Sequence, residues 1–223
     1  MQKTLTFVHT MPMHIATFDQ LLAEAAPDIP ARHIVDESLL NDARAQGLTP
    51  DITQRIEATM RNAFDQGAAV VLCTCSTIGG RAEAAGQPDM PVLRVDRAMA
   101  ERAVALGSRI VLVAALRSTL EPTRALLNDA AQRAGKAISM VDVVCDAAWP
   151  RFEQGDHAGY IAEIVACLRN AADQGDVIVL AQASMAGAAA LCADLPVPIL
   201  SSPQLGLEAA VQAYRTLGQR NLV

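Results

Sequence analysis

Residues 65–79, DQGAAVVLCTCSTIG, contain the pattern that decides the fold, because it returns as residues 173–187, DQGDVIVLAQASMAG. Each copy joins Asp-Gln-Gly to a short aliphatic run and then to a turn of small and polar residues. A second pair, MPVL at 90–93 and VPIL at 197–200, repeats at a spacing that is shorter by one position. Both spacings are close to half of the 223 residues, so we interpret the chain as two similar halves rather than as unrelated strand–helix units.

Aliphatic runs rich in Val, Ile and Leu predict the strands of an α/β protein. Such runs are typical of parallel strands covered on both faces, and the stretches between them have the length of helices. We therefore predict two pseudo-symmetric halves, each a doubly wound parallel sheet, formed by residues 1–97 with about 205–223 and by residues 98–204. The predicted strands are residues 4–8, 69–72, 91–95, 109–114, 138–144, 177–181 and 197–200.

Local signals predict where three of the helices begin. Apolar residues that recur every four positions predict a helix that starts near Asp51, and Asp156 can cap a helix that carries a second apolar stripe. Ser118 and Glu121 have the spacing of a capping box, in which each side chain bonds the other residue's backbone N–H.

The composition excludes several classes of protein. The chain is 52% hydrophobic, so it can form a core, and its net charge of −6 without a basic cluster argues against a nucleic-acid partner. No apolar run approaches the roughly 20 residues that a membrane helix needs, and the first residues lack a secretory pattern. We expect a cytoplasmic protein whose five cysteines are free thiols, with a homo-oligomer left open.

Cys75 is the main candidate for chemistry. It follows a predicted strand and precedes Ser76 and Thr77, which can open a helix, and ligands of open α/β sheets bind at the carboxyl ends of strands. The positive end of a helix dipole lowers the pKa of a thiol from about 8.5, and the free N–H groups of a first turn suit a carboxylate. We therefore expect a reactive Cys75 beside a carboxylate site, and a structural role for Cys73.

Other strand ends supply further candidates. His9 ends the first predicted strand and is a candidate for assisting proton transfer near pH 7, or else a structural histidine; His14, His33 and His157 are expected to be structural. After the strand 109–114, Ser118 fits a helix cap, and Thr119 remains a candidate ligand for a carboxylate.

Motifs for dinucleotides, phosphate loops, zinc and the α/β-hydrolase nucleophile are all missing from the sequence. We therefore expect neither a metal nor a cofactor.

With these motifs in place, the chain resembles the aspartate/glutamate/hydantoin racemase superfamily over essentially its whole length. Cys75-Ser76-Thr77 is similar to the family's first motif, Cys-Asn-Thr, and His9-Thr10 stands where the family often has Asp-Ser. The resemblance implies two α/β halves with the site in the cleft between them, no pyridoxal phosphate, and a small carboxylate as substrate. It also implies substrate-binding roles for Thr10, Ser76, Thr77, Thr119 and Ser184.

One departure from the family pattern matters for the chemistry. The family's second cysteine is absent: the spacing of the Asp-Gln-Gly repeat places Ala183 opposite Cys75, whereas the family's Leu-Gly-Cys motif places Gln182 there. Neither residue titrates, so a symmetric racemase with two thiols is not expected unless His9 takes the second role.

Three hypotheses about the function remain. The first is Cys75-mediated proton transfer at the carbon next to a carboxylate, as in an isomerase or racemase. The second is a one-cysteine enzyme that resembles arylmalonate decarboxylases or maleate isomerases. The third is a non-catalytic protein that binds a small acid, which an ordinary thiol pKa at Cys75 would favour.

Overall fold

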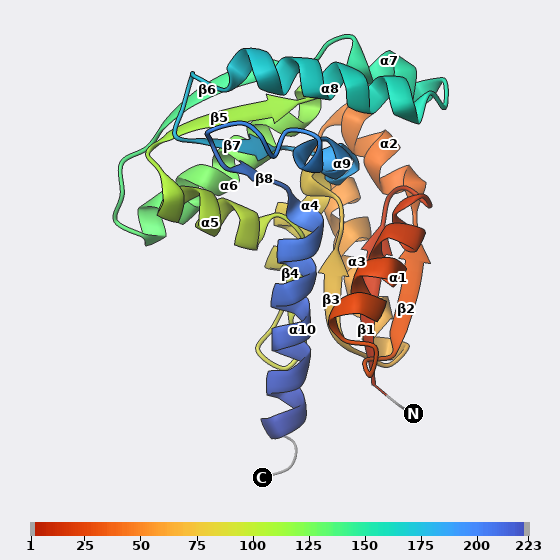
Figure 1. Ribbon diagram of the computed structural model, residues 1–223. Coiled ribbons are helices and arrows are strands. Elements are labelled where there is room, and N and C mark those ends of the chain that lie inside the picture. Colours follow the sequence, from red (N-terminus) through yellow and green to blue (C-terminus); the bar gives the residue numbers. More distant parts are fainter. Residues whose placement is uncertain (1–2, 221–223) are drawn as a thin grey trace. The chain divides into compact units, whose positions relative to one another are not determined.

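The computed structural model describes residues 3–220, and the chain divides into two compact units. One unit comprises Met1–Asp96 with Pro203–Val223, and the other comprises Arg97–Ser202 (Figure 1). We call them unit 1 and unit 2 and describe each by itself. None of the described helices is long and apolar enough to cross a membrane.

Unit 1 contains a four-stranded parallel sheet in the order β2-β1-β3-β4. The strands are β1 (Thr4–His9), β2 (Ala31–Val35), β3 (Ala68–Cys73) and β4 (Val92–Arg94). The helices of this unit are α1 (His14–Ala25), α2 (Glu37–Gln46), α3 (Pro50–Asp65), α4 (Ser76–Ala84) and α10 (Ser202–Arg220), the last of which starts at the unit boundary.

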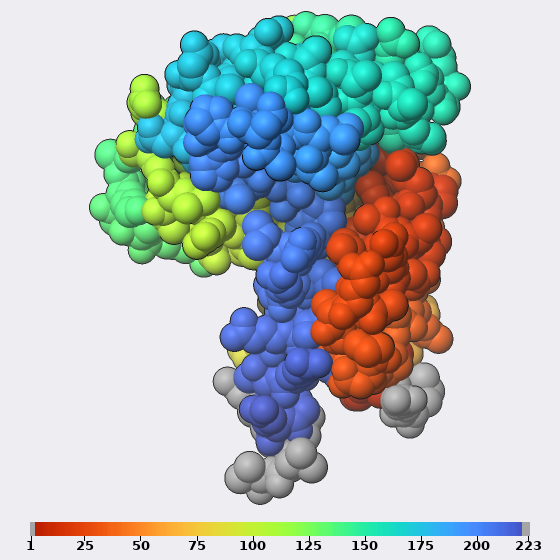
Figure 2. Space-filling view, viewed as in Figure 1, coloured from red at the N-terminus to blue at the C-terminus, as the bar shows by residue number. Residues whose placement is uncertain are grey.

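Helices cover both faces of this sheet. Successive strand residues point to opposite sides, and the strands carry apolar side chains on both. Val8, Val71 and Cys73 belong to a buried cluster with residues of α2, α3 and α4, whereas Phe7 and Leu72 belong to a second cluster with residues of α1 and α10. Figure 2 shows α1 in red and orange and α10 in blue as the outer surface over this second cluster. The sheet is therefore doubly wound, as predicted.

Unit 2 contains a parallel sheet in the order β6-β5-β7-β8. Its strands are β5 (Arg109–Ala114), β6 (Ser139–Val144), β7 (Val177–Leu180) and β8 (Ile199–Leu200). Its helices are α5 (Arg97–Leu106), α6 (Leu120–Arg133), α7 (Ala148–Glu153), α8 (His157–Ala171) and α9 (Ala186–Ala190), with the short 3-10 turns η1 (Arg117–Thr119) and η2 (Ala183–Met185).

The two sheets have the same topology, and their strand registers show which residues correspond. The repeat of MPVL as VPIL relates Val92 to Ile199. Val71 pairs with Val92 in unit 1 and Ile178 pairs with Ile199 in unit 2, so Val71 corresponds to Ile178. The Asp-Gln-Gly segments before these strands are spaced one position further apart than this correspondence requires. The difference arises at the start of β3, where Thr4 pairs with Ala68 but Leu5 pairs with Val70, so Ala69 is an extra residue.

Most predicted strands are present with shifted ends, and β5 has the predicted bounds. The strand β2 was not predicted, because the edge strand ARHIV is only partly buried and contains two basic residues. Asp156 caps α8 as predicted by accepting a hydrogen bond from Gly159 N. The helix α3 begins at Pro50, close to the predicted start near Asp51, and Thr49 is its N-cap. The capping-box prediction was wrong, because α6 continues directly from the turn η1 and has Thr119 at its N-cap position.

Candidate functional site

The loop that joins β3 to α4 positions Cys75. Its backbone is extended (φ −111°, ψ 116°), and it stands at the N-cap of α4 with 9% of its surface exposed. The hydroxyl of Thr10 and the backbone N–H groups of Thr77 and Ile78 lie close enough to favour a thiolate. Ser76 and Thr77 form the first turn of the helix and are buried beside it. Four of the residues singled out in unit 1, Thr10, Cys75, Ser76 and Thr77, are thus brought together at one edge of the sheet.

Burial has the larger effect on this thiol. It raises the pKa of Cys75 above its ordinary value, and the Thr10 hydroxyl and the two N–H groups only partly offset that increase. The expectation of a lowered pKa was therefore wrong, because it considered the helix N-terminus without the cost of desolvating a charge. In this structure Cys75 is a protonated thiol at neutral pH. Cys73 is fully buried, as expected for a structural thiol, and burial raises its pKa as well.

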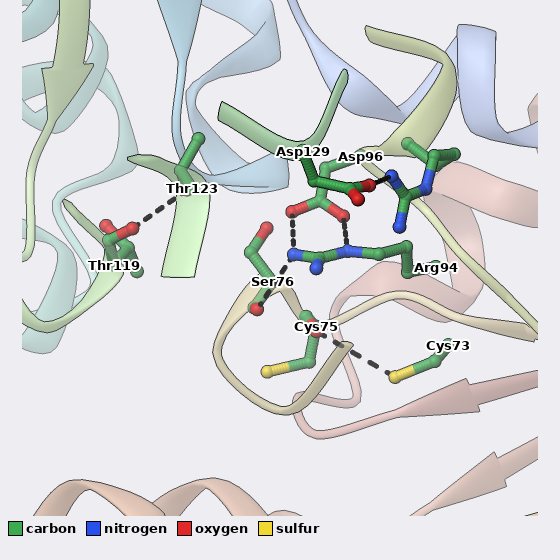
Figure 3. Close-up of polar contacts among 9 residues, drawn as sticks. Cys73, Cys75, Ser76, Arg94, Asp96, Thr119, Thr123 and Asp129 are labelled. Carbon is green, nitrogen blue, oxygen red and sulfur yellow. Dashed lines mark hydrogen bonds and ion pairs between the residues drawn. The ribbon is translucent and has the colours of Figure 1, made fainter. Parts of the chain in front are cut away.

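A buried ion pair, which the sequence analysis did not single out, supports this loop (Figure 3). Arg94 Nε and Nη2 donate to the two carboxylate oxygens of Asp96 at 2.6 and 3.0 Å, and Arg94 Nη2 lies 3.5 Å from the carbonyl oxygen of Ser76. Gly79 lets α4 approach this pair, since an added Cβ would lie 3.2 Å from the Arg94 side chain. The pair therefore holds the first turn of α4 and the end of β4 together.

His9 is completely buried at the end of β1 and is hydrogen-bonded through both ring nitrogens. Nδ1 lies 2.8 Å from Thr74 Oγ1, and Nε2 lies 2.9 Å from His33 Nδ1. Burial, followed by the neighbouring His33 and His14, lowers the pKa of His9 to about 3. Of the two roles considered for His9, these contacts and the lowered pKa favour the structural one, because the ring stays neutral near pH 7.

In unit 2, Gln182 occupies the position that Cys75 has in unit 1. The correspondence of Val71 with Ile178 also relates these two residues, and Gln182 has the same extended N-cap backbone (φ −127°, ψ 138°) before η2. The alternative that placed Ala183 opposite Cys75 was wrong. It used the spacing between the two Asp-Gln-Gly segments, which is longer by one position because unit 1 has the extra residue Ala69 between its segment and the rest of β3. Ala183 corresponds instead to Ser76.

The side-chain oxygen of Gln182 is fully used within unit 2. Oε1 accepts hydrogen bonds from the backbone N–H groups of Ala115 at 2.8 Å and Leu116 at 3.1 Å. These N–H groups follow β5 directly, so the carboxamide connects the loop after β7 to the loop after β5. Unlike a thiol, an amide does not titrate and cannot act as a general acid or base near neutral pH.

The other candidates of unit 2 also lie where strands end, and their hydroxyls have partners. Thr119 Oγ1 donates to the carbonyl of Leu116 at 2.7 Å, and Thr123 Oγ1 donates to the carbonyl of Thr119 at 2.8 Å (Figure 3). Ser184 Oγ lies 2.8 Å from the hydroxyl of the buried Tyr160. Since Thr119 donates its proton internally, its oxygen remains available only as an acceptor.

Comparisons with known proteins were made for sequence and for structure. A family profile described as Asp/Glu/Hydantoin racemase matches residues 15–210, whereas no curated protein matches the sequence significantly. Glutamate racemase from Francisella tularensis subsp. tularensis SCHU S4 is similar in structure, with a TM-score of 0.71, 17% identity, and coverage of 99% of this chain and 83% of that one.

Two further similar structures carry other names. Aspartate racemase from Picrophilus torridus has a TM-score of 0.69 and 14% identity, with 97% of this chain and 95% of that one covered. Allantoin racemase from Klebsiella pneumoniae has a TM-score of 0.63 and 18% identity, with 97% and 89% covered. At these identities the structural likeness shows a shared fold.

Proposed function

The chain belongs to the Asp/Glu/hydantoin racemase family, and from this premise we propose that it is a cytoplasmic, cofactor-independent isomerase that moves a proton at the carbon next to a carboxylate. The substrate class is a small carboxylic or amino acid. The observation that carries the proposal is Cys75, a thiol at a helix N-terminus surrounded by hydroxyl and N–H donors.

The donors around Cys75 suit the intermediate of such a reaction. Removing a proton next to a carboxylate places negative charge on the carboxylate oxygens, and fixed N–H and O–H donors stabilise that charge. The hydroxyl of Thr10 contacts Cys75, and Ser76 and Thr77 follow it in the first turn of α4, so we assign these three side chains to the carboxylate. In unit 2 we assign Thr119 and Ser184 to substrate binding.

Proton transfer in this proposal is served by one thiol. The unit 2 counterpart of Cys75 is Gln182, whose amide neither gives nor takes a proton at neutral pH. Losing a positioned acid or base costs roughly 10²–10⁴-fold in rate. We therefore expect exchange of the substrate proton on one face, carried out by the thiolate form of Cys75, and slower inversion.

The raised pKa of Cys75 favours a second candidate reaction. A protonated thiol is a proton donor, and a lyase that removes CO₂ from a malonate-like substrate needs such a donor. In that reaction the C–C bond to the leaving carboxylate breaks, its electron pair forms an enediolate, and Cys75 supplies the proton to carbon. The resulting thiolate then takes a proton from water.

The experiment is ¹H NMR of a panel of small carboxylates in D₂O with the wild-type protein. Exchange of the proton next to the carboxylate supports the isomerase, and release of CO₂ supports the lyase. Cys75→Ala should abolish either signal, whereas Cys167→Ala, which removes a thiol of unit 2, should retain it. Binding of a carboxylate without exchange or CO₂ release would instead identify a non-catalytic acid-binding protein, and activity that survives in Cys75→Ala would refute the mechanism.

A further inference from the structure

Four side chains of unit 1 form an unbroken hydrogen-bonded chain from the surface to the loop that holds Cys75. Asp19 Oδ1 lies 2.9 Å from His33 Nε2, His33 Nδ1 lies 2.9 Å from His9 Nε2, and His9 Nδ1 lies 2.8 Å from Thr74 Oγ1. The side chain of Asp19 is 57% exposed and that of His33 is 15% exposed, while His9 is completely buried. The four residues come from α1, β2, β1 and the end of β3, and the last of them directly precedes Cys75.

Because burial lowers the pKa of His9 to about 3, His9 is kept neutral, and with this condition two fully bonded arrangements of the chain remain. A carboxylate only accepts, so His33 Nε2 carries a proton in both. In the first arrangement, His9 Nε2–H donates to His33 Nδ1, and Thr74 donates its hydroxyl proton to His9 Nδ1. Both imidazoles are then neutral.

In the second arrangement, His33 carries protons on both nitrogens and donates from Nδ1 to His9 Nε2. His9 is still neutral, but its proton is now on Nδ1 and is donated to Thr74 Oγ1. The hydroxyl proton of Thr74 then goes to the carbonyl of Val8, which lies 3.2 Å away. The two arrangements differ by one proton and by the direction in which the Thr74 hydroxyl points.

We propose that this chain is a proton-linked switch, in which uptake of one proton by His33 changes the tautomer of His9 and turns the Thr74 hydroxyl from His9 to Val8. One proton enters from solvent, no bond between heavy atoms changes, and the positive charge rests on His33 beside the Asp19 carboxylate. The inference rests on the proposed function in one respect: His33 and Asp19 are then positioning residues that act on the Cys75 loop through His9 and Thr74.

The surroundings of the switch support the placement of this charge. His9 has its pKa lowered to about 3, so it remains neutral in both arrangements. The ring of His14 from α1 lies 6.4 Å from that of His9, and burial lowers its pKa too. Phe7 stacks on His33, with the ring centroids 5.0 Å apart. The helix α10 contributes Leu207, Ala210 and Val211 to the buried apolar cluster on this face.

The direct test is long-range ¹H–¹⁵N NMR of the histidine rings in the full chain, titrated from pH 8.5 to pH 5. We expect His9 to change from the Nε2–H to the Nδ1–H tautomer with the same midpoint at which His33 becomes doubly protonated. A His9 tautomer that stays constant while His33 titrates, or changes at a different midpoint, would overturn the switch.

Thr74→Val tests the coupling from the far end, because the described contacts of the Thr74 side chain do not include His33. Without the hydroxyl, the Nδ1–H of His9 has no acceptor, so protonating His33 leaves a buried donor unsatisfied. We expect the His33 midpoint to fall by about 0.7–2 pH units, and Thr74→Ser to restore it. A wild-type midpoint in folded Thr74→Val would contradict the inference.

Asp19→Asn provides a second, surface variant whose folding is not at risk. Removing this carboxylate should lower the His33 midpoint by up to about 0.7 pH units, and the tautomer change of His9 should move with it. A shift of the His33 midpoint that His9 does not follow would refute the coupling.

Measuring the rate of proton exchange against pH distinguishes the switch from the proposed function. If the wild-type protein exchanges a carboxylate proton, its rate should change at the His33 midpoint, and that inflection should move with Asp19→Asn. A rate without this inflection would refute the positioning role. A tautomer change without exchange of any carboxylate would retain the switch and refute the enzyme.

Discussion

Substituting Gly206 by Ala tests how closely α10 approaches the end of β4. A Cβ added to Gly206 would lie 2.3 Å from the carbonyl oxygen of Val95 and 2.8 Å from its Cγ2. Val95 is completely buried in the apolar cluster that includes Leu207 and Ala210. The obstructing oxygen belongs to the backbone, so neither a rotamer change nor a small side-chain shift can relieve the contact.

The expected change in the free energy of unfolding follows from a comparison with Gly218→Ala on the same helix. A Cβ added to Gly218 would have no atom within 4 Å. Both substitutions gain up to about 1 kcal/mol of helix propensity, so the difference between them isolates the steric cost. Overpacking costs about 1–3 kcal/mol, and a backbone obstruction belongs at the upper end of that range. We expect Gly218→Ala to stabilise unit 1 slightly and Gly206→Ala to destabilise it.

The assay is urea unfolding of both variants and the wild type, followed by far-ultraviolet circular dichroism. The single tryptophan, Trp149, lies in unit 2, so its fluorescence in the same titration shows whether that unit is affected. Unfolding of Gly206→Ala at the same urea concentration as Gly218→Ala, or at a higher one, would show that the close approach of α10 to Val95 is wrong.

Three further predictions concern the loop and its surroundings. Asp96→Asn removes the carboxylate that accepts two hydrogen bonds from the buried Arg94, and it should lower the free energy of unfolding by about 3–5 kcal/mol. Asp28→Asn in an exposed pair should lower it by at most about 1 kcal/mol, and equal losses in urea titrations would contradict the buried pair. Because burial raises the pKa of Cys75, its alkylation by iodoacetamide, followed by mass spectrometry, should keep accelerating above pH 9, and a plateau below pH 8.5 would refute this. The pKa of His9 is about 3 in the folded state against 6.5 in the unfolded state, so its contribution to stability is complete above pH 6.5 and is lost as pH falls toward 3. The wild type should therefore lose about 2 kcal/mol between pH 7 and pH 5 from this residue, and a His9→Asn variant with the same loss would exclude it as the cause.

Elements buried on both faces could be predicted from the sequence, whereas those that depend on pairing between strands could not. The strand Arg109–Ala114 has the predicted bounds because its aliphatic run marks it clearly. Residues 31–35 were missed because an edge strand with one partner tolerates charged residues. Hydrophobic patterning reports burial, and β2 is only half-buried.

The candidate site shows the same division. Cys75 could be proposed from the sequence because it lies between a predicted strand and the start of a helix, and the structure places it at the N-cap of α4. The contact between His9 and His33 was missed because it arises only when β1 and β2 pair in register. Arg94 and Asp96 are two residues apart in the sequence, but their burial, which gives the pair its importance, is a property of the packed unit. The lowered pKa expected for Cys75 was wrong for a related reason: the helix terminus is local and visible in the sequence, whereas desolvation is a property of the packed unit.

The extra residue Ala69 has a consequence for how the two halves have diverged. It lies at the amino end of its strand, and the ladder recovers its register within one pair, so the opposite end of the sheet is unaffected by the difference in length. A protein of this type can therefore accept a one-residue insertion there without displacing the loop that bears the reactive side chain. Alignments between the halves, or between this chain and distant relatives, should allow a gap at that position, because an ungapped alignment equates residues that face opposite sides of the sheet.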